Sequence, residues 1–443
     1  MTYFLMKFFS WLNNDILALP TTILFAGTAV FLTLKTGFIQ IRALPAFIRM
    51  LIHGIDNNNQ KKSPKNESTI NPFHALFASM ATTIGMGNVV GPSVAIIAGG
   101  PGALFWLIFY IFFGSVTKLT EVSYALATRT KTADGHISGG PIEYLKSVSP
   151  ILATWYGYVI IFLFALWSSL QSNTLANIAA QEGIHHGVIG LILAAFAYLA
   201  LQGGARRVGA LASGLVPLMF IMYVSFALFI LCKDPYALMQ AIKLIYSSVI
   251  TPEAALGGFL GGTIFHAMNA GFSRAIFITE AGLGTSSIAH ATAQTKRPID
   301  QGILAMGSMI ADAMLCSISG LLVLVTQVWK FPADTVGSTL VYEAFKLHAP
   351  AMAKWILLLS ITLFILTTVM GNSFNGLQSF GALTNHRYKS LYIGATVIII
   401  FVGALMPMPL IWEISDTLLR LVAIPNLIGL LLLSFKRPEV ITY

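Results

Sequence analysis

Long apolar segments separated by short polar connections run through almost the whole chain. We place about eleven of them, at residues 16–34, 72–97, 102–128, 150–170, 187–201, 209–232, 257–284, 300–328, 352–371, 390–406 and 411–434. A helix that crosses a bilayer needs about 20 predominantly apolar residues. Most of the segments approach or exceed this length, so the pattern predicts an all-α polytopic membrane protein with about 11 transmembrane helices.

The segment 72–97 is interrupted near its centre by residues that disfavour a helix. Its stretch TTIGMGNVVG (82–91) contains Gly85, Gly87 and Gly91, and Pro92 follows. Inside a helix, glycine costs about 1 kcal/mol relative to alanine, and proline costs about 3 kcal/mol. In hydrocarbon, the backbone groups freed by a break must find other partners. We therefore predict that this span is broken and that its open backbone binds a small polar solute.

The segment 257–284 is a second apolar span interrupted by glycine, at Gly271, and by polar residues, which are Asn269, Ser273, Arg274, Thr279 and Glu280. Close helix packing also selects glycine, so this span alone leaves both interpretations open. The two interrupted spans, however, occupy corresponding positions. When the segment 16–34 is set aside, each opens a set of five segments, and the two sets have opposite orientations. Paired interrupted helices in an inverted repeat indicate a transporter's substrate site.

The predicted repeat divides the chain into five parts. An extra transmembrane helix and a cytoplasmic loop occupy 1–71, and an extracytoplasmic connection occupies 234–256. The two five-helix repeats occupy 72–233 and 257–434, and a cytoplasmic tail occupies 435–443.

The basic charge of the chain follows this topology. The chain is 56% hydrophobic and 10% charged, with a formal net charge of +9, whereas soluble domains carry about 25% charged residues. When the connections alternate between two sides, one side collects Lys35, Arg42, Arg49, Lys61, Lys62, Lys65, Arg129, Lys131, Lys146, Arg206, Arg207, Lys296, Arg297, Arg387, Lys389, Lys436 and Arg437. The other side has Lys7, Lys233, Lys243, Lys330, Lys346 and Lys354. The positive-inside rule makes the first side cytoplasmic. The N-terminus is then outside and the C-terminus inside, and no nucleic-acid partner is needed.

Polar side chains within the apolar segments are candidates for function, because an ionisable group at the bilayer centre costs at least about 2.5–3.5 kcal/mol. They are Lys118, Glu121, Gln171, Asn173, His266, Asn269, Arg274, Glu280, Asp312, Thr367, Thr368, Asn372, Asn375, Asp416 and Arg420. Helical spacing favours two structural ion pairs, Lys118 with Glu121 and Asp416 with Arg420. We interpret His266 as a core histidine. For Asp312, structural and functional roles both stay open.

Several ordered motifs resemble the alanine or glycine:cation symporter family. TIGMGNVVG (83–91) followed by AGGPGALFW (98–106) is similar to the family's GTGNIAG…GGPGAxFW signature, and SGGPIEYL (138–145) to its GGPMYY segment. RAIFITEAGLGTSSIAHA (274–291) resembles RGLFSNEAGLGSAPIAHA. LQSNTLA (170–176), GGARRV (203–208), VPLMFIMY (216–223) and the end 412–433 agree as well. The resemblance runs from about Asp15 onward. It implies a leucine-transporter-like fold, a five-plus-five inverted repeat with one extra N-terminal helix.

The resemblance also implies a secondary transporter that carries a small neutral amino acid into the cell with a sodium ion, across the inner membrane of a bacterium. A zwitterion at mid-membrane needs partners for both of its charges. Backbone N–H groups at the N-terminal end of a half-helix, around Gly85–Gly87, suit the carboxylate. Carbonyls at the C-terminal end of a half-helix, near Phe277–Thr279, suit the ammonium group. Glu280 either contacts the substrate or braces the break.

The expected substrate-binding residues are therefore Thr82, Thr83, Gly85, Met86, Gly87, Asn88, Gln171, Asn173, Phe277, Ile278, Thr279, Glu280 and Asn372. For the sodium ion, the fold resemblance implies carbonyls near Ala81–Thr83 and the hydroxyls of two threonines, which gives Ala81, Thr83, Thr367 and Thr368.

The chain departs from the family pattern at four of these positions. Thr279 stands where the family usually has asparagine, and Met86 where it commonly has threonine. In TTVMGNSFNG (367–376), Asn372 replaces a tryptophan and Asn375 a tyrosine. Asparagine is smaller and adds a donor and an acceptor, which predicts a roomier pocket for serine, threonine, asparagine or glutamine. If neighbouring side chains fill the space, alanine or glycine is the alternative.

Three other functions compete with sodium symport as interpretations of the sequence. Proton coupling stays open as an alternative. A channel predicts a ring of acidic residues or a carbonyl filter, and the sequence offers neither. An enzyme is disfavoured because GTSS (284–287) lacks a G-x-S-x-G context and no metal-ligand spacing occurs. We predict no catalytic residues, and partners limited to the amino acid, the sodium ion and the lipid bilayer.

Overall fold

The computed structural model describes residues 2–54, 69–131, 137–180, 183–250, 264–330, 337–348, 350–406 and 408–443. Helices make up most of these residues. Among them, the strands are one short antiparallel pair, β1 (Thr130–Lys131) with β2 (Ile137–Ser138), and a single parallel β-bridge joins Ile70 to Ala293. The predicted all-α class is therefore confirmed.

The predicted break in the first interrupted span is confirmed. The span consists of α5 (Pro72–Thr83) and α6 (Met86–Gly99). Asn71 begins α5 by accepting a hydrogen bond from the Phe73 N–H at 2.8 Å, as N-cap residues do. Between the two helices, Ile84 and Gly85 have extended backbone. Pro92 lies within α6 and does not end it.

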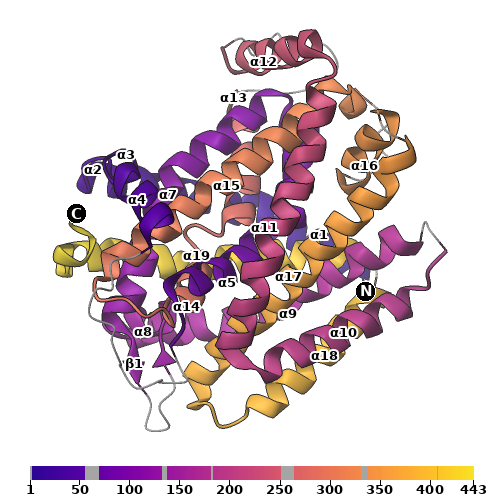
Figure 1. Cartoon of the computed structure of the whole chain (residues 1–443). Coiled ribbons are helices and arrows are strands. Elements are labelled where there is room, and N and C mark those ends of the chain that lie inside the picture. The colour runs from indigo at the N-terminus through magenta and orange to yellow at the C-terminus, as the bar shows by residue number, and fades with distance from the viewer. Residues whose placement is uncertain are drawn as a thin grey trace.

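The other helices of the first set are α7 (Gly102–Thr128), α8 (Pro141–Lys146), α9 (Pro150–Ala180), α10 (His186–Gln202) and α11 (Gly204–Leu231). The second set comprises α13 (Ile264–Thr279), α14 (Thr285–His290), α15 (Pro298–Val325), α17 (Pro350–Thr384), α18 (Lys389–Leu405) and α19 (Met408–Lys436). Both sets open with a broken helix. In Figure 1, α5 and α14 lie near the middle of the bundle, with α10 and α18 side by side at one edge.

Further helices precede and connect these sets. The N-terminal part contains α1 (Thr2–Trp11), the π-helix η1 (Leu12–Leu17), α2 (Ala18–Lys35), α3 (Ile39–Arg42) and α4 (Leu44–His53). α12 (Pro235–Ile250) links the two sets and lies at one end of the molecule (Figure 1). The short helices η3 (Val328–Lys330) and α16 (Gly337–His348) follow α15, and η4 (Pro438–Ile441) ends the chain.

Every predicted apolar segment overlaps a helix of the described residues, and the first part of the segment 257–284, residues 257–263, lies outside them. Eight helices of the described chain are long and apolar enough to cross a membrane. The segments 187–201 and 390–406 correspond to α10 and α18, each of 17 residues, and 257–284 to the broken α13 and α14. The total of eleven spans stays a prediction. Large apolar side chains also face outward, among them Phe162 (63% exposed) and Leu191 (63% exposed), as expected for a protein surrounded by lipid.

Candidate functional site

The side chain of Asn88, in the first turn of α6, stabilises the first break by hydrogen bonds. Its Oδ1 accepts a hydrogen bond from the Gly85 N–H at 3.0 Å, and its Nδ2 donates to Asp312 Oδ1 of α15 at 2.9 Å. The first N–H groups of a helix have no partner within that helix. Since Gly85 is already bonded, the N–H groups of Met86 and Gly87 are the ones that α6 directs toward the break.

The second break lies at Glu280–Gly284, between α13 and α14. The half-helix end expected near Phe277–Thr279 is the end of α13. Gly271, which the sequence offered as one of the interruptions, lies inside α13. A Cβ there would come within 2.5 Å of the Ala103 carbonyl oxygen and 2.8 Å of the Leu107 nitrogen. This glycine therefore serves the close packing of α13 on α7.

The backbone of the second break has an unusual conformation that the protein itself stabilises. Glu280 has φ +56°, Gly282 φ +96° and Gly284 φ +79°, and a positive φ is costly for a residue other than glycine. Hydroxyl groups of α7 and α9 donate to its carbonyls, Tyr110 to Ala281 at 3.0 Å and Tyr156 to Leu283 at 2.7 Å. The buried polar backbone groups are thus paired with protein, as a buried break requires.

Lys118 and Glu121 supply the central contacts of this stabilisation. The predicted ion pair between them is wrong: among the described residues, no ion pair within 4.0 Å joins the two. Lys118 Nζ donates to the Thr279 carbonyl at 3.2 Å. Glu121 Oε1 accepts from the N–H groups of Gly282 and Gly284, both at 2.9 Å, and from Asn426 Nδ2 at 2.8 Å. Both side chains are fully buried, so α7 holds the second break through two ionisable residues.

A small cavity lies between the two breaks, and we call it the inner cavity. It is lined by Thr82, Thr83, Gly85, Gly87, Trp167, Gln171, Phe277, Ile278, Glu280, Thr368 and Asn372. Most of the residues expected at the substrate site thus lie together, on α5, α6, α9, α13 and α17. Trp167 also lines the cavity, although no sequence motif singled it out, and its ring centroid lies 5.9 Å from that of Phe277. The volume is about 20 Å³, which holds about one water molecule, so the inner cavity is closed in this conformation.

Three oxygen atoms in the wall of the inner cavity are buried and have no hydrogen-bond partner among the residues that the structure describes. They are Thr83 Oγ1, Gln171 Oε1 and Asn372 Oδ1. Buried polar atoms are normally bonded, and all three can accept a hydrogen bond or coordinate a cation. Glu280 lies in the same wall. Its Oε2 accepts from the hydroxyls of Thr82, at 3.3 Å, and Thr285. The cavity is therefore rich in acceptors.

Four of the expected substrate-binding residues do not line the inner cavity. Asn88 braces the first break, and Met86 is buried in the apolar core. Asn173 Nδ2 donates to the carbonyls of Gly403 at 2.9 Å and Met406 at 2.6 Å, at the end of α18. Thr279 bonds its own helix through Oγ1, which donates to the Ala275 carbonyl at 2.8 Å.

The expected sodium-binding threonines also separate. Thr368 lines the inner cavity, and its Oγ1 lies 2.5 Å from where a Cβ on Gly85 would be. Thr367 Oγ1 instead contacts Met219 Sδ of α11 at 3.5 Å and bonds carbonyls of its own helix. Ala81 lies against α17, because a Cβ on Gly371 would come within 3.4 Å of its carbonyl carbon. Because it contacts α11, Thr367 faces away from the first break, whereas Ala81 and Thr368 lie beside it.

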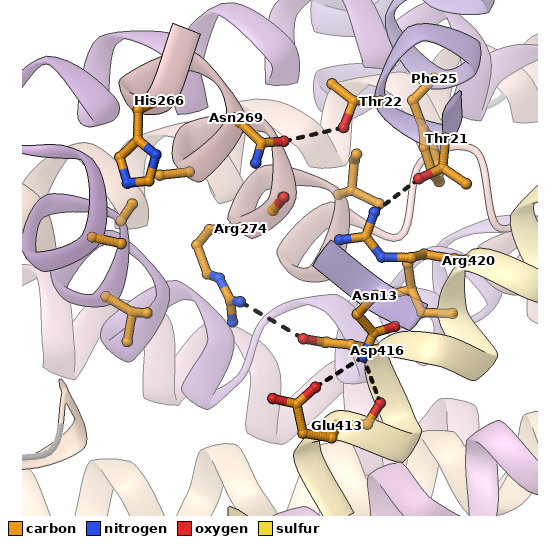
Figure 2. Close-up of a pocket in the computed structure, with 17 residues that line it drawn as sticks. Asn13, Thr21, Thr22, Phe25, His266, Asn269, Arg274, Glu413, Asp416 and Arg420 are labelled. Carbon is orange, nitrogen blue, oxygen red and sulfur yellow. Dashed lines mark hydrogen bonds and ion pairs between the residues drawn. The ribbon is translucent and has the colours of Figure 1, made fainter. Parts of the chain in front are cut away.

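Asp416 and Arg420 do not form the predicted pair within α19. Asp416 Oδ2 lies 3.9 Å from Arg274 Nη2 of α13, while Arg420 Nη1 donates to Thr21 Oγ1 of α2 at 2.8 Å. His266 is exposed and is not the core histidine we expected. These residues line a second, larger cavity, the outer cavity, shown in Figure 2.

Comparison with known proteins assigns the sequence to one family. The profile of the sodium:alanine symporter family matches residues 2–442. The chain belongs to the sodium:alanine symporter family. It is 34% identical over 423 residues to a sodium/alanine symporter, AgcS, of Methanococcus maripaludis, with 93% of this chain and 91% of that protein covered. It is 29% identical to a probable sodium/glutamine symporter, GlnT, of Bacillus subtilis, with 93% and 85% covered.

The fold is shared with more distant transporters. The crystal structure of MhsT in complex with L-phenylalanine matches with a TM-score of 0.59 at 14% identity, covering 84% of this chain and 90% of that one. The predicted leucine-transporter-like fold is thereby confirmed. The protein is a multi-pass membrane transporter and not an enzyme.

Proposed function

We propose that this protein is a sodium-coupled symporter that imports a small neutral amino acid by alternating access, with the inner cavity as its substrate site. The observation that carries the proposal is the set of unpartnered acceptor oxygens in that cavity, between two breaks that end helices there. An ammonium group offers three donors and no acceptor. A sodium ion likewise needs several oxygen ligands. The cavity therefore matches a zwitterion and a cation together.

The two ends of the zwitterion find different helix termini. The substrate carboxylate binds the N–H groups of Met86 and Gly87 at the start of α6, where the helix dipole favours an anion. The ammonium group binds the carbonyls of Phe277 and Ile278 and Gln171 Oε1. The amides of Ala281 and Gly282, which would continue α13, donate instead to Thr279 Oγ1 and Glu121 Oε1. The Thr279 carbonyl accepts a hydrogen bond from Lys118, so only the carbonyls of Phe277 and Ile278 remain of the expected set for the ammonium group.

The sodium ion binds where α5 ends beside α17. The last carbonyls of α5 have no further helical turn to bond them, and Thr83 Oγ1 has no hydrogen-bond partner in the described part of the chain. Thr368 Oγ1 donates its proton to the Phe364 carbonyl at 2.8 Å, which leaves its lone pairs for a cation. A sodium ion bound here stabilises the substrate-loaded form, because it binds that form more tightly than the empty one.

Transport requires the inner cavity to open to each side in turn. The half of the molecule with α6 and α13 faces outward in this proposal, because the basic connections mark the opposite side as cytoplasmic. In that orientation the N-terminus is extracytoplasmic, the C-terminus is cytoplasmic, and the membrane is the inner membrane of a bacterium. The division into an extra helix and two five-helix repeats at 72–233 and 257–434 is part of the same proposal.

Sodium coupling is tested with the threonine pair of α17. Uptake into proteoliposomes should saturate with substrate and require an inward sodium gradient. Thr368→Val keeps the side-chain shape and removes one oxygen ligand. We expect the sodium concentration for half-maximal uptake to rise at least about tenfold, as for a loss of about 1.4 kcal/mol of binding free energy.

Thr367→Val is the matched control, because Thr367 faces α11, and its sodium dependence should equal that of the wild type. Equal sodium dependence in Thr368→Val and the wild type would exclude this sodium site. Uptake that depends on a proton gradient and not on sodium would show that the protein couples transport to protons instead of sodium ions. A flux that does not saturate would indicate a channel.

Asn372 determines which side chains the substrate site accepts. Its buried Oδ1 is an acceptor for a hydroxyl or amide group of the substrate, so we propose serine, threonine, asparagine or glutamine as substrates besides alanine. Asn375 contributes indirectly, since its Nδ2 lies 3.4 Å from the Thr285 carbonyl at the second break.

Asn372→Trp should remove uptake of the larger polar amino acids and keep that of alanine and glycine. Competition of labelled alanine uptake by the twenty amino acids measures this in both proteins. Asn375→Tyr serves as the control for added bulk near the same site. Inhibition of the wild type by alanine and glycine alone would contradict the larger-substrate proposal.

A further inference from the structure

The chain that follows the extra N-terminal helix turns sharply and continues as a short helix on the surface of the bundle. Gly37 and Phe38 have φ +61° and +56°, and this left-handed turn follows the end of α2. The backbone hydrogen bonds of α3 and α4 continue through Ala43, which bonds to one residue of each helix. The two helices therefore form one segment, residues 39–53, about 22 Å long at 1.5 Å per residue. We call it the surface helix. Figure 1 shows α3 and α4 beside α7, near the C-terminus.

One face of the surface helix is fixed to the bundle. It consists of Ala43, Phe47 and Met50, which have the spacing of one helical stripe. The first two are buried, and Met50 is partly buried against the core. The Phe47 ring fills the space beside Gly307 of α15, where any Cβ would collide with the ring. This contact fixes the rotation of the surface helix about its own axis.

A second face of the surface helix is apolar and exposed. Ile41, Leu44, Ile48 and Leu51 follow one another at spacings of three or four residues, and Ile52 adjoins them. Ile41 is 57% exposed and Ile52 is 71% exposed. A contiguous apolar patch bordered by polar residues marks a surface that binds another protein or a membrane. We call these five residues the apolar stripe.

The apolar stripe continues a surface of the protein that lies in the bilayer. α2 belongs to a helical stretch long and apolar enough to cross a membrane. Leu34, near the end of α2, and Phe38, in the turn, are both exposed, and they join the outer surface of α2 to the apolar stripe. Because the apolar surface continues from α2 to the stripe, lipid favours the stripe over a second protein as its occupant.

The third face of the surface helix is basic. Arg42, Arg49 and His53 lie seven and four residues apart, so they share a face, and all three are exposed. Residues 39–53 contain no aspartate or glutamate. Arg49 follows Ile48 by one residue, about 100° around the helix. The basic face therefore borders the apolar stripe, as phospholipid headgroups border their acyl chains.

We infer that the surface helix is a binding site for an anionic phospholipid, with acyl chains along the apolar stripe and the phosphate beside Arg49 and Arg42. Helices that lie in the membrane interface combine an apolar face with a face of lysine or arginine, and anionic lipids attract those basic residues. Arg42 Nη2 also donates to the Tyr443 carbonyl at 3.4 Å, so Arg49 contributes more to lipid binding. The bound lipid belongs to the cytoplasmic leaflet, and this assignment of the side alone rests on the proposed function.

Quenching of a fluorophore on the surface helix tests the inference in the full-length protein. Leu51→Cys, in a Cys232→Ser background, places a bimane label in the apolar stripe, and the remaining Cys316 is buried. The protein is reconstituted in phosphatidylcholine vesicles that contain spin-labelled phosphatidylglycerol or spin-labelled phosphatidylcholine. We expect phosphatidylglycerol to quench at the lower mole fraction. This preference should fall about fivefold in Arg49→Gln, as for one basic residue near an anionic surface, and less in Arg42→Gln.

Arg297→Gln is the control, because it removes an exposed arginine of a different region, and it should keep the full preference. Ile48→Gln should weaken quenching by both lipids. Equal quenching of the wild type by the two lipids would overturn the inference. So would a preference abolished by inorganic phosphate at constant ionic strength, which would indicate a site for free phosphate. Self-quenching between labels, without quenching by lipid, would indicate a second copy of the chain instead.

These measurements need neither substrate nor sodium, so they are independent of the test of transport. Equal quenching in a protein with sodium-driven uptake would overturn the lipid site and leave the proposed function intact. Preferential quenching that Arg49→Gln reduces, in a protein without sodium-driven uptake, would support the lipid site and overturn the proposed function.

Discussion

Gly85→Ala is expected to abolish sodium-driven uptake in a protein that still folds and inserts. The backbone at Gly85 is extended, with φ −158° and ψ −159°, so alanine adds no backbone strain. Its Cβ would however lie 2.5 Å from Thr368 Oγ1. Either Thr368 moves or α17 separates from the first break. Overpacking of this kind costs about 1–3 kcal/mol, and here the displaced group is a proposed sodium ligand.

Gly87→Ala is the matched comparison. Its Cβ would meet Ile278 Cγ1 at 3.5 Å and Phe277 Cε1 at 3.6 Å, which are ordinary contacts, so the loss of uptake should be much smaller. Initial uptake rates, normalised to the protein recovered in proteoliposomes, measure both variants. Wild-type uptake by Gly85→Ala, or a greater loss in Gly87→Ala than in Gly85→Ala, would contradict the contact between Thr368 and the first break.

The first break could be located from the sequence, because the cost of glycine and proline in a helix is local. Gly85 and Gly87 stand where the helix ends and restarts. Glycine was a weaker guide in the second span. Gly271 packs against α7 inside a continuous helix, while the break follows Thr279, at the half-helix end that the resemblance and the polar residues indicated. Glycine alone does not distinguish the two roles, because both exploit its missing side chain.

The sequence also did not predict which way each polar side chain points from its helix. Successive residues of a helix are rotated by about 100° about its axis. Gln171 and Asn173, two residues apart, therefore cannot both face the inner cavity. Thr367 and Thr368 likewise point in different directions and contact different neighbours. Only the packing of α9 and α17 decides which member of each pair faces inward. Similarly, Lys118 and Glu121 have the spacing of an ion pair, yet each reaches a backbone group about 160 positions away in the sequence.

Glu121→Ala is expected to abolish substrate binding and to lower the melting temperature. The substitution leaves three buried donors without their acceptor: the N–H groups of Gly282 and Gly284, and Asn426 Nδ2. An unsatisfied buried donor costs about 1–3 kcal/mol, so the combined loss is roughly 3 kcal/mol or more. Glu280 keeps its positive φ only while the surrounding contacts impose it, and we expect its carboxylate to leave the inner cavity wall.

Glu121→Gln separates the hydrogen bonds from the charge. All three donors bond to Oε1, while Oε2 is buried without a partner among the described residues, so an amide can keep the accepting oxygen in place. Glu121→Gln should therefore retain binding and most of the stability that Glu121→Ala loses. Thr120→Val controls for substitution in α7, because Thr120 donates to the Val116 carbonyl of its own helix. Thermal unfolding in detergent and sodium-dependent equilibrium binding measure all three variants. If Glu121→Gln were as damaging as Glu121→Ala, the ionised carboxylate beside Lys118 would be the essential feature. If Glu121→Ala bound substrate normally, the second break would not depend on α7 at all.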